Sequence, residues 1–110
     1  MDTPEFSNIE LISMGNVEFK NKLLAILKTE FPVELEQFEF CFKNGELGLA
    51  AEVVHKLKHK INLLNMKNDY KLARQFEIDL SNGKSGSCND FKVIMNNITT
   101  FLNSFKIPIK

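Results

Sequence analysis

Two histidines that lie four residues apart are the side chains in this sequence best suited to chemistry. His55 and His59 fall within residues 51–66, where apolar residues recur every three or four positions: Ala50, Val54, Leu57, Ile61 and Leu64. This spacing indicates an amphipathic helix whose apolar side packs against other helices. We expect His55 at the edge of the buried stripe, facing outward, with Lys58 one turn along. A histidine held on a rigid helix beside a cation is suited to carrying an anion.

The charged residues are unevenly distributed, although the net charge is zero. Residues 1–54 hold ten acids and four bases and residues 55–110 hold four acids and ten bases, so the two parts carry −6 and +6. Six bases surround or follow His55: Lys56, Lys58, Lys60, Lys67, Lys71 and Arg74. Such a field favours a bound phosphoryl group and an acidic partner. A nucleic-acid partner is the weaker alternative, because no binding motif or aromatic stacking platform accompanies the lysines.

Helical spacing continues on both sides of the histidines. It predicts a short helix over 9–14 and further helices over about 16–30, 33–43, 46–64, 68–80 and 89–105. We expect Pro32 to separate two of them, since proline is tolerated in the first turn of a helix, and Pro108 to end the last. Residues 81–87 contain only turn-forming and polar residues and predict a loop.

These elements predict an all-α protein, an antiparallel four-helix bundle with a short extra N-terminal helix. We expect the bundle domain to cover residues 8–107 and residues 1–7 to form a flexible arm. A chain of 110 residues has the size of one domain. It has neither a run of 18 apolar residues nor a charged-then-apolar leader, which argues against a membrane span and a signal peptide. Cys41 and Cys88 show no disulfide or metal spacing, so a reduced, cytoplasmic setting is expected.

The region around His55 resembles the histidine-containing phosphotransfer (HPt) domains of multistep bacterial phosphorelays. That family's signature is a small residue, then His-x-Leu-Lys-Gly, then a glycine some six residues further on. The positions that match or nearly match are Val54, His55, Leu57 and Lys58. His59 and Asn65 stand where the family usually has glycine. Asn65 is a mild departure, because asparagine tolerates a left-handed helix end.

The resemblance extends beyond this signature, to about residues 8–105. Residues 9–19 look like the family's opening helix and the turn that follows it, and residues 43–46 look like the turn before the phosphorylated helix. Only the His-x-Leu-Lys core is specific to the family.

The resemblance implies that His55 is the phosphoacceptor and that Lys58 pairs with the phosphoryl oxygens. The neutral imidazole nitrogen would act as nucleophile toward an aspartyl phosphate. Such a chain is a phosphoryl carrier rather than an enzyme, and has no cofactor or metal of its own. Its partner would be a receiver domain, of a hybrid sensor histidine kinase or of a response regulator, that supplies the aspartate and Mg²⁺. The family also implies a monomer, and His59, Lys56 and Asn62 would border the receiver-docking face.

His59 leaves other interpretations open. An imidazole four residues after His55 lies on the same side of the helix, where it could crowd the partner, hydrogen-bond the phosphoryl group or swing into solvent. One alternative is therefore a receiver-binding module of the same fold that has lost transfer. A less favoured alternative is a small helical protein that binds metal through His55 and His59. Zinc would need one or two further ligands, and the neighbouring lysines would repel a cation.

Overall fold

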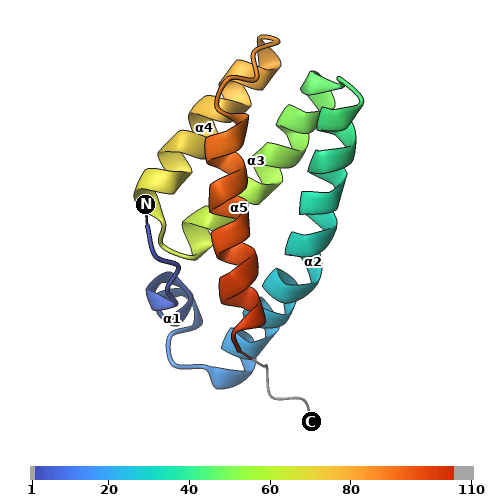
Figure 1. Ribbon diagram of the computed structural model, residues 1–110. Helices are drawn as coiled ribbons and strands as arrows, with labels where there is room; N and C mark the ends of the chain where they lie inside the picture. Colours follow the sequence, from blue (N-terminus) through green and yellow to red (C-terminus); the bar gives the residue numbers. More distant parts are fainter. Residues whose placement is uncertain (1, 106–110) are drawn as a thin grey trace.

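The computed structural model describes residues 2–105. These residues form five helices and no strand: α1 (Ser7–Ser13), α2 (Val17–Lys43), α3 (Leu47–Leu63), α4 (Lys67–Ser81) and α5 (Cys88–Asn103). Successive long helices run in opposite directions, and α5 lies in front of α3, between α4 and α2 (Figure 1). The predicted all-α bundle with a short N-terminal helix is confirmed. The expected domain end at residue 107 and Pro108 lie outside the described residues.

The helix α2 is longer than its sequence predicted. The separate helices expected over 16–30 and 33–43 are one helix, and Pro32 lies inside it. A proline in a helix interior removes one backbone hydrogen bond and costs about 3 kcal/mol. The two-helix prediction was wrong because Phe31 and Phe38, on either side of the proline, are both buried in the core. A single helix keeps these two rings on the same buried stripe.

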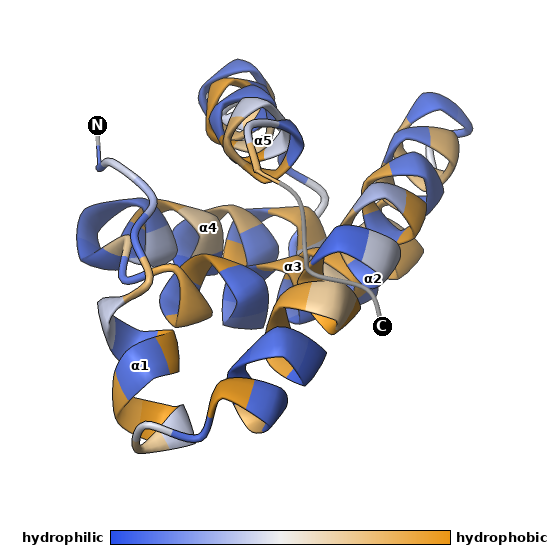
Figure 2. Cartoon of the chain, turned by 90° about the horizontal axis from the view of Figure 1, so that it is seen from below, coloured by the Kyte–Doolittle hydropathy of each residue, from blue (hydrophilic) through white to orange (hydrophobic). Residues whose placement is uncertain are grey.

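The core forms around α3, which packs between α2 and α4. The five apolar residues predicted to form its seam are fully buried: Ala50, Val54, Leu57, Ile61 and Leu64. Three phenylalanines join the remaining long helices, with ring centroids 4.9–5.9 Å apart: Phe38 of α2, Phe76 of α4 and Phe91 of α5. Apolar residues gather on the helix sides that face one another (Figure 2). Burial of each large apolar side chain contributes roughly 1.5–3 kcal/mol, so this seam holds α3 firmly in place.

The segment expected to be a flexible arm, residues 1–7, makes defined contacts from residue 2 onward. The backbone N–H of Glu5 donates to the carbonyl of Leu64, at the end of α3, over 3.0 Å. The ring of Phe6 packs against that of Phe101 in α5, with centroids 5.1 Å apart. The segment therefore links the start of α1 to the turn between α3 and α4 and to α5.

Asn65 lies in this turn and adopts the left-handed conformation, with φ of 59°. Its side-chain amide donates to Glu5 Oε1 (2.8 Å) and Ser7 Oγ (3.0 Å). Asp2 accepts the backbone N–H of Asp69 in the first turn of α4, where a carboxylate also complements the helix dipole. Among residues 2–105, no helix combines the length and the apolar character that crossing a bilayer requires.

Candidate functional site

A glutamate on α4 connects the two residues of α3 that sequence reasoning singled out. Glu77 Oε2 lies 3.1 Å from His55 Nδ1, and Glu77 Oε1 lies 2.8 Å from Lys58 Nζ. His55 and Lys58 are one helical turn apart on the same side of α3, as their spacing predicted. The packing of α3 against α4 then brings the carboxylate across to both. The site is therefore a three-residue cluster, His55–Glu77–Lys58, built from two helices.

Sequence reasoning did not identify Glu77. The contact depends on how α4 is placed along α3, which residue spacing within one helix does not specify. Two signals were present in the sequence. Glu77 directly follows Phe76, which faces the core, and Glu77 and His55 are equally distant from Met66 in the turn between the helices. In an antiparallel hairpin, residues equally distant from the turn lie at about the same level.

Lys58 is held more tightly than an exposed helix lysine. Its side chain is only 10 % exposed, and its ammonium lies 5.8 Å from the centroid of the Tyr70 ring of α4. His55 is 53 % exposed and so remains open to a partner. The charge of Lys58 is thus directed toward Glu77 and lies beside, rather than over, the exposed imidazole.

The neighbours of Glu77 favour its ionised form. Burial opposes its ionisation, but the hydrogen bond and charge of Lys58, reinforced by His55, outweigh burial and hold the pKa of the Glu77 carboxyl below its ordinary value. A carboxylate only accepts hydrogen bonds, so its contact with His55 places the proton on Nδ1. In a neutral imidazole, Nε2 then carries the lone pair. Glu77 therefore sets His55 in the tautomer whose exposed nitrogen is a nucleophile.

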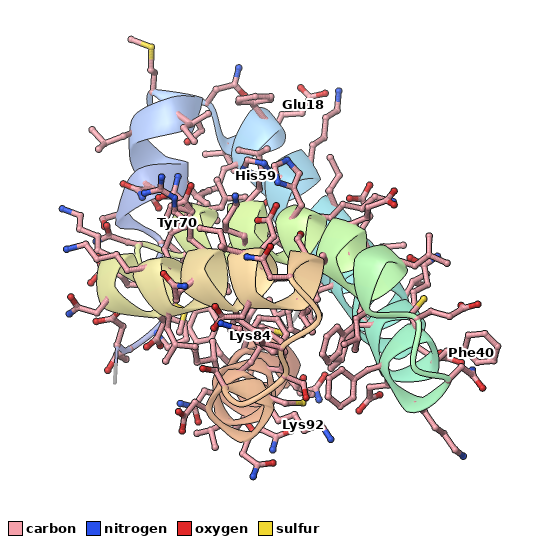
Figure 3. The ribbon with its side chains drawn as sticks, turned by 90° about the horizontal axis from the view of Figure 1, so that it is seen from above. Glu18, Phe40, His59, Tyr70, Lys84 and Lys92 are labelled. Atoms are coloured by element: carbon pink, nitrogen blue, oxygen red, sulfur yellow. The ribbon has the colours of Figure 1, made fainter. Side chains whose placement is uncertain are left out.

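His59 remains exposed, but its ring turns toward this nitrogen. Its Nε2 lies 3.3 Å from Nε2 of His55, and the two rings are nearly perpendicular, at 89°, with centroids 4.8 Å apart. When His55 Nε2 carries the lone pair, His59 Nε2 must be the donor of this contact. Figure 3 shows His59 projecting from α3 on the side of α1 and of the start of α2.

The two remaining predicted site residues lie beside the histidines, in separate hollows. Lys56 is exposed and lines a shallow hollow together with His55 and Glu77. Asn62 lines a second hollow with His59. Leu11 and Ile12 of α1 also line this second hollow. Together with the next exposed apolar residues along the chain they are here named the α1 patch: Leu11, Ile12, Met14 and Val17.

The basic field expected around His55 is weaker than its charge count predicted. Lys60 points toward α2, where its ammonium lies 2.9 Å from Glu34 and 3.1 Å from Glu30. Its side chain is 13 % exposed. With Lys58 also paired, two of the lysines nearest to His55 have their charge compensated within the fold. The charge count predicted a stronger field because the neutralising acids lie on other helices.

His55 and His59 do not gather a metal-ligating set. Among residues 2–105, no group of three or more histidine, cysteine, aspartate or glutamate side chains is arranged to hold a metal ion. The nearest acid, Glu77, contacts His55 through Nδ1, the ring nitrogen that points away from His59.

Comparison of the chain with protein-family models, with curated proteins and with solved structures finds no match. The geometry of the cluster is therefore the basis for assigning a function.

Proposed function

We propose that this protein carries a phosphoryl group on His55, which it accepts from the aspartate of one receiver domain and passes to the aspartate of another. The observation that supports this proposal most is the bond between Glu77 and His55 Nδ1. In the neutral ring this contact leaves the lone pair on Nε2, on an exposed helix face. The resemblance around the His-x-Leu-Lys core also points to His55 as the phosphoacceptor.

The transfer balances with the groups of this chain and of its partner. The lone pair of His55 Nε2 attacks the phosphorus of an aspartyl phosphate, an N–P bond forms, and the P–O bond to the aspartate breaks. The receiver aspartate leaves as a carboxylate, and the receiver supplies the Mg²⁺ that offsets the phosphoryl charge. The ring becomes cationic and keeps its Nδ1 proton. Glu77 stabilises that cation, and Lys58 lies close enough to the site to pair with the phosphoryl oxygens once it leaves Glu77.

Docking of the receiver would use the surface around the two histidines. The α1 patch is strongly exposed, with Leu11 at 73 % and Met14 at 89 %, and it borders the hollow that holds His59 and Asn62. Exposed apolar residues next to a polar site are typical of protein–protein contacts. Lys56 adds an exposed positive charge on the other side of His55, which speeds encounter with an acidic pocket more than it tightens binding.

The test is transfer from phosphorylated receiver domains of the source organism to the native chain and to His55→Gln. We expect acid-labile, base-stable label on the native protein and none on the variant. Circular dichroism checks that the variant is folded, and a binding measurement checks that it still docks. Label on both proteins would assign the phosphoacceptor to another residue.

One observation favours a second function, a receiver-binding module that has lost transfer. His59 lies 3.3 Å from the nitrogen that would have to react. The same assay separates the two functions: receiver binding without label on the native chain, under conditions in which the receiver is phosphorylated, would replace the carrier by the binding module.

A further inference from the structure

We infer that His59 is a lid on the reactive nitrogen of His55, and that its displacement is a required step before phosphoryl transfer. This inference rests on the proposed function, since it concerns how the same nitrogen becomes available. Glycine is usual at this position in the family that the chain resembles, so the lid would be a property of this chain.

The geometry of the pair places His59 in the path of attack. With the proton of His55 on Nδ1, the lone pair of Nε2 lies in the ring plane and points away from the ring. His59 Nε2 lies within hydrogen-bond distance of that atom, at 3.3 Å, with its ring turned by 89°. A phosphorus atom must approach along the same lone pair, so donation from His59 and attack on a phosphoryl group exclude one another.

The structure also indicates which of the two rings moves. His55 is fixed at its other nitrogen by Glu77, which Lys58 holds in place. His59 is exposed and borders the hollow formed with Asn62 and with Leu11 of α1. Rotation about the side-chain bonds of His59 takes its ring toward this hollow without moving the backbone of α3. The lid therefore opens by a change of rotamer, and its open position lies next to the α1 patch.

The size of the effect follows from the strength of the contact. A hydrogen bond between exposed side chains favours the bonded state about three- to tenfold. The rate at which His55 accepts a phosphoryl group is reduced by the fraction of molecules in which its nitrogen is uncovered. Removal of the lid should therefore raise the rate about three- to tenfold.

The experiment uses phosphoramidate as a small phosphoryl donor, so that no receiver is needed. In this reaction the P–N bond of the reagent breaks, ammonia leaves and an N–P bond to His55 forms. The rate of phosphohistidine formation is measured by ³¹P NMR for the native chain, His59→Ala, His59→Gln and His55→Gln. The glutamine variant keeps an N–H donor, while the alanine variant removes it. The ¹⁵N resonance of His55 Nε2 reports directly whether the nitrogen accepts a hydrogen bond.

We expect His55 to be labelled about three- to tenfold faster in His59→Ala than in the native chain and at a rate between the two in His59→Gln, and the phosphohistidine signal of residue 55 to be absent in His55→Gln. The ¹⁵N resonance should move in His59→Ala toward that of a free imidazole nitrogen. An unchanged or lower rate of labelling at His55 in folded His59→Ala would overturn the lid. Failure of the proposed relay is distinct, because it would leave these rates as expected and abolish only transfer from receivers.

Discussion

Two lysines on α3, two residues apart, form ion pairs on opposite sides of the helix. Lys58 reaches Glu77 of α4 over 2.8 Å, and Lys60 reaches Glu34 of α2 over 2.9 Å. Their side chains are similarly shielded, at 10 % and 13 % exposure. Each pair thus fastens α3 to one neighbouring helix. Only the first pair also contacts an imidazole, because Glu77 extends its second oxygen to His55.

The difference between the two pairs separates a structural ion pair from a functional one. On the α2 side, both carboxylate oxygens of Glu34 lie close to the ammonium of Lys60, and Glu30 is a second acid beside the same ammonium. The acid that meets Lys58 divides its oxygens between a cation and a titratable nucleophile. The two ion pairs have nearly the same shielding and the same distance. The contact of Glu77 with His55 is therefore what gives the Lys58 pair a chemical role.

The sharpest way to break this comparison is to remove each glutamate in turn. We expect Glu77→Ala to slow phosphoryl acceptance by His55 about ten- to a hundredfold, by analogy with the loss of a carboxylate that orients a metal-binding imidazole. Glu34→Ala should leave that rate unchanged. Phosphohistidine formation from a phosphorylated receiver measures both variants. Equal rates in Glu77→Ala and the native chain would show that the tautomer of His55 does not depend on this contact.

Removal of the lysines tests whether the two pairs are alike in stability. We expect Lys58→Ala and Lys60→Ala each to lower the free energy of unfolding by about 1–3 kcal/mol, because each leaves a shielded carboxylate without its cation. Urea unfolding at pH 7, followed by circular dichroism, measures the loss. Only Lys58→Ala should also reduce phosphoryl acceptance. A slower transfer in Lys60→Ala would mean that the α2 side of the helix contributes to the site.

The smallest effect is on the pH dependence of stability. Because the pKa of folded Glu77 lies below its ordinary value of 4.5, its contribution is complete above that value and is lost as pH falls through the folded pKa. The destabilisation caused by Glu77→Gln should therefore be full near pH 6 and shrink below about pH 4. Unfolding free energies between pH 3 and pH 7 measure it. Thr100→Ala, an exposed change that removes no titrating group, is the control. A constant difference across this range would contradict the pairing.

Residue spacing was sufficient to predict the helix that presents the site. The stripe from Ala50 to Leu64 is buried as expected, and His55 faces outward at its edge, whereas Lys58, one turn along on the same side, is itself shielded by α4. These features depend only on the geometry of one helix, which residues three and four apart report directly.

The parts of the site that were not predicted all depend on contacts between helices. Glu77 reaches His55 only after α4 has packed against α3, and Lys60 turns from a source of positive field into an ion-paired side chain only when α2 is in place. The continuity of α2 through Pro32 likewise reflects core packing, which overrode a local preference. The sequence left the orientation of His59 open. Its helix position alone does not decide whether the side chain crowds the partner, hydrogen-bonds the phosphoryl group or swings into solvent.

The link between residues 2–6 and the turn after α3 has a consequence for cooperativity. α1 has one fully buried apolar residue, Ile9, and its other contacts with the rest of the protein are largely polar, such as the bond from the Asn8 amide to the carbonyl of Asn62 and the ion pair of Glu10 with Lys20. Such a segment can open as a unit of its own while the α3–α4 hairpin stays intact. Amide hydrogens of α1 would then exchange with solvent faster than those of α3. The α1 patch would then be less persistent than the neighbouring imidazole of His55, which Glu77 holds at Nδ1.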